Sequence, residues 1–151
     1  MNEDAVPGSY RKILLGYDGS GNSKRALARA IEMSKESNAE LAIIYFVDLV
    51  AFQTFAAKHL LKELRDGMVA EAEKLVADAA LTAKRGGVMD VRTLVMHNRD
   101  PADAILSTAA EEAADLIIVG RRGVKGVERF LLGSVSSRVI DHSKCDVLVV
   151  K

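Results

Sequence analysis

The chain has 151 residues, of which 49% are hydrophobic and 28% charged, as is typical of one globular domain with a sizeable core. Its formal net charge is zero, so no general basic surface predicts a nucleic-acid partner. A single cysteine, Cys145, excludes an internal disulfide, and no apolar run is long enough to cross a membrane.

Residues 1–10 begin with acidic side chains and contain Pro7 and Gly8, a composition typical of a flexible lead-in. No apolar run follows the acidic start, so we expect no secretory signal and a cytoplasmic protein. Residues 11–151 contain no linker, internal repeat or low-complexity segment, and we expect them to form one domain.

Five apolar runs alternate with stretches of helical spacing along this domain. The runs are almost wholly apolar, as expected of strands that are covered on both faces. We expect strands at 12–17, 41–47, 91–96, 116–120 and 146–150. We expect helices that end near residue 38, span 56–84, start at 101 and span 134–142.

Residues with capping chemistry stand at the expected helix ends. Ser20 and Ser23 are candidate caps of the first helix, and Asp100 is a candidate cap of the third. Asn38 is expected to end the first helix, and the glycine pair 86–87 the second.

The long helix expected at 56–84 carries an apolar stripe that we expect to line one face. Its members are Leu61, Leu64, Met68, Ala72, Leu75 and Ala79. Gly67 within this helix destabilises it by about 1 kcal/mol relative to alanine.

Strands that alternate with helices predict a parallel sheet with right-handed crossovers. In open sheets of this kind, ligands bind beyond the carboxyl ends of the strands, where the strand order reverses. If the first and fourth strands are neighbours at that point, Asp18 and Gly120 meet there.

The segment 120–136 is the most informative part of the sequence. Gly120 is followed by two residues and Gly123, and then by nine residues and the pair Gly133-Ser134. This glycine- and cation-rich segment links a predicted strand to a predicted helix start. Unpaired N–H groups and the helix dipole favour an anion at such a start, which indicates a phosphate site.

The spacing of these glycines resembles the nucleotide-binding motif of the universal stress protein family, in its ATP-binding branch. The resemblance extends from about residue 11 to residue 151, and the segments 13–20, 43–47 and 146–150 support it. It implies a single open, doubly wound parallel sheet of five strands in the order 3-2-1-4-5, with helices on both faces. Such a fold is Rossmann-like, of the adenine nucleotide alpha hydrolase type.

The resemblance also implies a ligand and an assembly. The ligand is ATP with Mg²⁺, in which the phosphates hold most of the ion and Asp18 could help to place it. The assembly is a homodimer through the last strand, at 146–150, whose edge would offer unpaired backbone groups. We expect no membrane or nucleic-acid partner, and the sequence does not indicate which protein partner, if any, the chain binds.

We expect the nucleotide to contact residues from four segments. The backbone of the glycine segment and the hydroxyls of the last helix would hold phosphate. Asp18 would bind the ribose, and the backbone of Val47 would bind the adenine. Tyr17 would line one side of the site. The expected set is Tyr17, Asp18, Val47, Gly120, Arg121, Gly123, Gly133, Ser134, Val135 and Ser136. Simpler alternatives are an Asx turn at Asp18, a core position at Val47 and a surface loop rich in turn residues.

No residue is a convincing catalytic group. The chain has neither the P-loop pattern nor a G-x-S-x-G nucleophile, and its three histidines lack metal-ligand spacing. We therefore expect a nucleotide-responsive regulatory module in the stress response, with at most slow hydrolysis or autophosphorylation. The alternatives are a nucleotide-free dimeric interaction protein of the same fold and a slow ATPase.

The sequence departs from the family pattern at two turns. Arg99-Asp100-Pro101 stands where a Gly-x-Pro turn is usual, beside the expected ligand. Cys145-Asp146 replaces the proline through which the last strand is commonly entered. The first departure affects the fit of the nucleotide, and the second affects only the entry of the strand.

Overall fold

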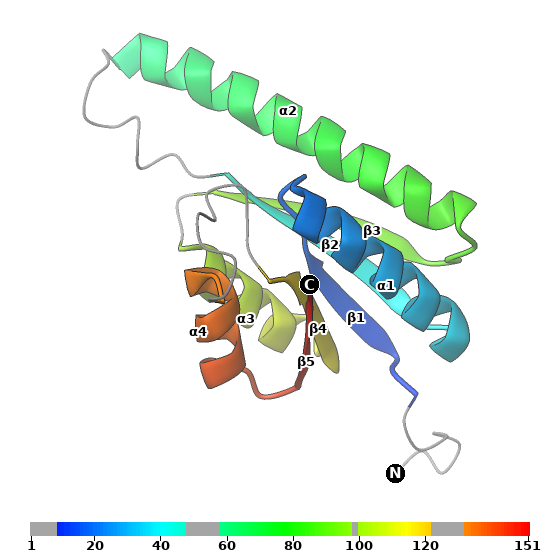
Figure 1. The fold of residues 1–151 in the computed structure, drawn as a ribbon. Coiled ribbons are helices and arrows are strands. Elements are labelled where there is room, and N and C mark those ends of the chain that lie inside the picture. Colours follow the sequence, from blue (N-terminus) through cyan, green and yellow to red (C-terminus); the bar gives the residue numbers. More distant parts are fainter. Residues whose placement is uncertain (1–8, 48–57, 98–99, 122–131) are drawn as a thin grey trace.

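The computed structural model describes residues 9–47, 58–97, 100–121 and 132–151, which form one parallel sheet between two layers of helices (Figure 1). The sheet has the order β3-β2-β1-β4-β5, as the family resemblance predicts. In chain order the elements are β1 (Lys12–Gly16), α1 (Gly21–Ser37), β2 (Glu40–Val47), α2 (Lys58–Arg85), β3 (Val91–His97), α3 (Pro101–Glu111), β4 (Leu116–Gly120), α4 (Ser134–His142) and β5 (Asp146–Val150).

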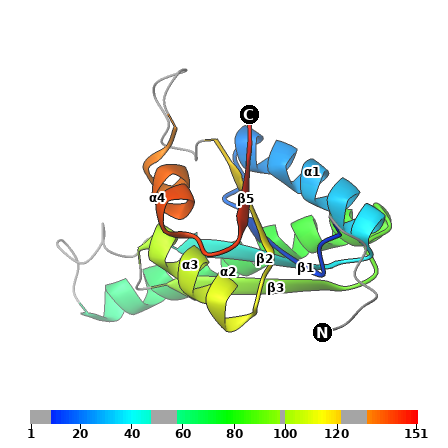
Figure 2. The same cartoon turned by 90° about the horizontal axis from the view of Figure 1, so that it is seen from below.

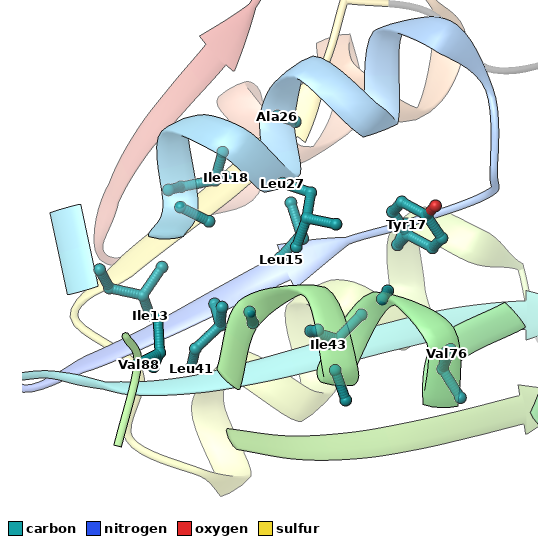
Figure 3. Packing of buried hydrophobic residues seen from close by; sticks show 14 of the residues in the cluster. Ile13, Leu15, Tyr17, Ala26, Leu27, Leu41, Ile43, Val76, Val88 and Ile118 are labelled. Carbon is teal, nitrogen blue, oxygen red and sulfur yellow. The ribbon is translucent and has the colours of Figure 1, made fainter. Parts of the chain in front are cut away.

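Side chains alternate between the two faces of the sheet and build one core on each. Ile13 and Leu15 of β1 are fully buried on the face that α1 and α2 cover (Figure 3). Leu14, between them, is fully buried on the opposite face, against α3 and α4. Both faces are therefore apolar, which explains why the strand sequences lack the alternation of a half-exposed sheet.

The predicted caps fix the ends of the helices. The Ser20 Oγ accepts a hydrogen bond from the Ser23 N–H at the start of α1, so Ser20, and not Ser23, is the cap. Asn38 ends this helix with a left-handed φ of 53°. Asp100 caps α3, and Gly87 follows α2 with a φ of +102°.

Helix α2 extends beyond the sheet at its amino-terminal half, as Figure 1 shows. Ala72, Val76 and Ala79 are buried, whereas Leu64 is 40% exposed. At Leu64 the apolar stripe therefore extends beyond the packed core. The stripe has the correct period, but the sheet ends before the helix does. None of the described helices is long and apolar enough to cross a membrane.

The amino ends of the strands are joined by a network of ion pairs. Lys12 of β1 contacts Glu40 and Glu112, each at 3.3 Å, and Arg92 of β3 contacts Glu112 at 2.7 Å. The hydrogen bond from Lys12 and the charge of Arg92 hold the pKa of Glu112 below its ordinary value. The network stabilises the end of the sheet opposite to the predicted site.

We predict that Glu112→Gln destabilises the protein at neutral pH, because it removes the charge that Lys12 and Arg92 stabilise. A carboxyl group with a lowered folded-state pKa contributes its stability above its ordinary pKa of 4.5 and loses it as the pH falls through the folded value. The difference from the parent in urea unfolding should therefore be present at pH 7 and vanish in acid. Glu111→Gln, the neighbouring exposed position, is the control. A difference that persists unchanged in acid would contradict this account.

Candidate functional site

Strands β1 and β4 are neighbours, so the segments that follow them lie at the same edge of the sheet. Gly120, the last residue of β4, pairs in register with Val150 of β5. The Arg121 N–H donates to the Val150 carbonyl at 2.8 Å, and the Arg121 carbonyl accepts from the Gly133 N–H at 2.9 Å. The carboxyl end of β4 is thus joined directly to the strand beside it and to the start of α4.

Gly120 packs against the first turn of α1. A Cβ at this position would lie 2.9 Å from the carbonyl carbon of Asn22 and 3.1 Å from the backbone nitrogen of Ser23. The sequence analysis includes this glycine among the residues expected to contact the nucleotide through their backbone. In the structure, the space that its missing side chain leaves is taken by the backbone of α1.

Ser136 holds α4 against the end of β4. Its side chain is buried, and its Oγ lies 2.8 Å from the Gly120 carbonyl oxygen and 3.2 Å from that of Arg121. A hydroxyl group has one proton, and here a carbonyl oxygen accepts it. In this structure the Ser136 hydroxyl therefore ties α4 to the end of β4, and its expected contact with phosphate stays a prediction.

The first turn of α4 presents backbone donors at this edge. Gly133 is the cap, with an extended backbone, and its own N–H is used by the Arg121 carbonyl. The N–H groups of Ser134, Val135 and Ser136 precede the first helical hydrogen bond, which runs from Ser137 to Gly133. No hydrogen bond among the described residues engages these three groups, and the helix dipole adds a partial positive charge there.

Asp18 lies just after β1 and is tied to the start of α1. Its Oδ1 accepts a hydrogen bond from the Ser20 N–H at 2.9 Å, which is an Asx turn. The Ser20 Oγ in turn accepts the Ser23 N–H, and the backbone of Ser23 lies against Gly120. A continuous series of contacts therefore connects Asp18 with Gly120 and, through the Gly120 carbonyl, with Ser136.

Tyr17 and Val47 lie on the side of the sheet edge away from α4. Tyr17 is 8% exposed, and its ring packs in the core between α1 and α2 (Figure 3). Burial raises the pKa of its phenol, and the charges of Asp18 and Asp78 raise it further, so the ring stays neutral. Val47 ends β2 and packs against Ala72 of α2, so its side chain is a core residue, as the simpler alternative holds.

The residues predicted to contact the nucleotide thus form two groups in the structure, and one of these residues, Gly123, is not described. One group joins Asp18 to the ends of β4 and the start of α4, and the other consists of Tyr17 and Val47. Gly123 lies outside the described residues, as do three cations of the same segment, Arg122, Lys125 and Arg129.

The sequence interpretation missed the contribution of α1. Asn22 and Ser23 contact the site through their backbones at Gly120. Arg25 donates from Nε to the Lys151 carbonyl at 2.9 Å and from a guanidinium nitrogen to the Asn22 side chain. Figure 2 shows the end of β5 beside the first turn of α1. No spacing in the sequence signals the contacts with Gly120 and Lys151, because they join segments more than 90 residues apart.

A protein-only metal site is not found in the part of the chain that the structure describes. No group of three or more His, Cys, Asp or Glu side chains there could hold a metal ion. A divalent cation at this edge would therefore need most of its oxygen ligands from a bound molecule. Asp18 is the carboxylate that lies at the carboxyl end of β1.

The parallel sheet, its strand order and the start of α4 beside Gly120 define a doubly wound α/β protein. The model of the universal stress protein family matches residues 9–151, and the chain belongs to that family.

Known relatives agree with this assignment over nearly the full chain. The universal stress protein YxiE of Bacillus subtilis is 34% identical over 149 residues, which is 94% of this chain and 99% of that protein. The universal stress protein UspA of Lactobacillus plantarum has a similar solved structure, with a TM-score of 0.86 and 28% identity, covering 95% of this chain and 99% of the other. A universal stress protein solved in complex with cAMP is 33% identical with a TM-score of 0.72, covering 95% of this chain and 98% of the other.

We predict that Gly120→Ala lowers the free energy of unfolding by roughly 1–3 kcal/mol, because its Cβ would press on the backbone of α1 and not on a flexible side chain. Gly67→Ala is the matched control. Position 67 lies inside α2, and apart from its chain neighbours and the backbone of the helix itself no atom lies within 4 Å of the added Cβ, so this change should raise the stability by up to about 1 kcal/mol. Equal effects of the two substitutions in chemical denaturation would contradict the close packing at Gly120.

Proposed function

We propose that this protein binds ATP with Mg²⁺ at the carboxyl ends of β1 and β4. The observation that carries the proposal is the first turn of α4, where three adjacent N–H groups have no hydrogen-bond partner among the described residues. Groups of this kind, at a helix start after a glycine, bind phosphate. The relative that was solved with cAMP, at 33% identity, supports an adenine nucleotide as the ligand.

The other predicted residues take roles around the phosphates. Asp18 would accept hydrogen bonds from the ribose or help to place the Mg²⁺, while its Oδ1 keeps the turn to Ser20. Val47 would offer its backbone to the adenine, and Tyr17 would border the base with a buried neutral ring. The Arg121 side chain would bring its charge near the phosphates, since its backbone N–H already donates to the Val150 carbonyl. The backbone of Gly123 would hold phosphate, as the resemblance implies.

Binding would serve regulation more than turnover. Hydrolysis needs a general base within hydrogen-bond reach of an attacking water. Asp18 is already engaged in the Asx turn, and His97, at the end of β3, is separated from β1 by β2. We therefore propose a nucleotide-responsive module of the stress response, located in the cytoplasm, with residues 11–151 as its domain and residues 1–10 as a lead-in.

The test is Ser134→Pro, which deletes one of the three N–H groups. Proline is well tolerated at the first position of a helix, and the extended backbone of Gly133 suits a residue before proline. A hydrogen bond to a charged acceptor contributes about 1.5–3 kcal/mol, so the dissociation constant for Mg-ATP should rise about 10- to 100-fold in calorimetric titration.

Ser134→Ala is the control for this test, because it removes the hydroxyl and keeps the N–H. Its loss of affinity measures what the hydroxyl contributes, and it should bind Mg-ATP more tightly than Ser134→Pro does. Equal affinities of the proline and alanine variants would show that the N–H of residue 134 does not hold the ligand, and would contradict the proposed site.

We also propose a homodimer through β5. This strand is one edge of the sheet, and it has β4 on one side only. The Val150 carbonyl faces β4, where it accepts from Arg121. Because backbone groups alternate along a strand, those of Val149 face the open edge and can pair with a second copy.

Val149→Pro should weaken this dimer without disrupting the contact with β4, since proline is accommodated where a strand's N–H faces away from its sheet. In a dimer with a two-fold axis, the substitution would remove the same hydrogen bond from both copies. We therefore expect the dimer dissociation constant, measured by sedimentation velocity, to rise about tenfold or more. Val149→Ala keeps the N–H and should dissociate less. A parent protein that is monomeric at micromolar concentration would overturn the proposal.

A further inference from the structure

A guanidinium group joins α4 to the start of α3. Arg138, in the second turn of α4, donates one hydrogen bond to the Asp100 Oδ1 and another to the Asp103 Oδ1 at 2.7 Å. The three side chains are between 44% and 61% exposed, so neither ion pair alone would contribute much to stability. The feature of interest is the geometry, because one planar group spans two carboxylates on a neighbouring helix.

The Asp100 carboxylate, one of the two that Arg138 contacts, is itself held in place by hydrogen bonds. The Asp100 Oδ1 caps α3 by accepting from the N–H groups of Ala102 at 3.0 Å and Asp103 at 3.3 Å. Pro101, at the first position of α3, restricts the backbone beside it. Arg138 therefore contacts the fixed end of another helix and not a mobile side chain.

The ion pairs of Arg138 and the contacts of α4 with the sheet involve different sides of α4. Ser136 binds the Gly120 carbonyl and Val139 is fully buried in the core, and these two residues lie three apart on one face. They fix the distance of α4 from the sheet. Arg138 is paired with two residues at the start of α3, a geometry that would restrict rotation of α4 about its axis and sliding along the sheet.

The direction of the N–H groups in the first turn depends on this orientation. α4 has nine residues, so its first turn and the turn that carries Arg138 are adjacent. Binding groups must be held within a fraction of an ångström of their working geometry, and neighbouring contacts supply that precision.

We propose that Arg138 is a positioning residue for the phosphate-binding turn of α4, anchored by Asp100 and Asp103; this inference rests on the proposed function. The Asp100-Pro101 start of α3 thereby has a role in the site. Its aspartate caps α3 and anchors α4 through the same oxygen atom.

The experiment compares the affinities for Mg-ATP and for adenosine, by calorimetry on the full chain. Arg138→Gln should weaken Mg-ATP binding about tenfold, within the loss that small misplacements of a binding group can cause. Adenosine binding should stay unchanged, because it does not use the phosphate-binding turn. Arg29→Gln is the matched control, since Arg29 forms an exposed pair with Glu32 on α1.

Asp103→Asn separates positioning from net charge. If Arg138 acts by position, the loss of one of its two anchors should weaken Mg-ATP binding, although less than Arg138→Gln does. If only charge matters, removing a negative group should tighten the binding of an anionic ligand, and that result would overturn the inference. This variant also keeps the test valid if Arg138→Gln does not fold.

The outcomes distinguish the two proposals. A parent protein that binds no ATP contradicts the proposed function. A parent that binds ATP, with the same ratio of ATP to adenosine affinity in Arg138→Gln as in Arg29→Gln, leaves the function standing and overturns the role of Arg138.

Discussion

The packing of the α1 backbone against Gly120 constrains the whole carboxyl edge of the sheet. A Cβ on residue 120 would lie 2.9 Å from the Asn22 carbonyl carbon. β4 and α1 can therefore approach this closely only because residue 120 is a glycine. The approach leaves the carbonyl groups of Gly120 and Arg121 to α4, where the Ser136 hydroxyl and the Gly133 N–H bind them. Two helix starts, on opposite faces of the sheet, are thereby held at the end of one strand.

The two ends of the sheet differ in how their polar groups are used. At the amino end, Lys12 and Arg92 are paired with the carboxylates of Glu40 and Glu112. At the carboxyl end, the structure gives no partner among the described residues to the N–H groups of Ser134, Val135 and Ser136. Three donors that have no partner among the described residues at one end of the sheet, with paired charges at the other, suit the first end to bind an anion.

Local chemistry in the sequence predicted most of the fold, and it predicted less of the site. Apolar runs, the Ser20 and Asp100 caps and the Asn38 end are signals carried by neighbouring residues, and each was confirmed. The exposure of Leu64 could not be predicted, because the apolar period of α2 does not tell where the sheet ends. The Ser136 tie and the Arg138 anchors join distant segments, and no local pattern encodes their partners.

The most direct test of the central claim is a backbone amide spectrum of the protein during titration with Mg-ATP. The account predicts that the amide protons of Ser134, Val135 and Ser136 shift downfield together and saturate, because each receives a phosphate oxygen as acceptor. Adenosine should leave these three signals in place. Saturable Mg-ATP binding that does not move them would contradict the claim that the first turn of α4 holds the phosphates.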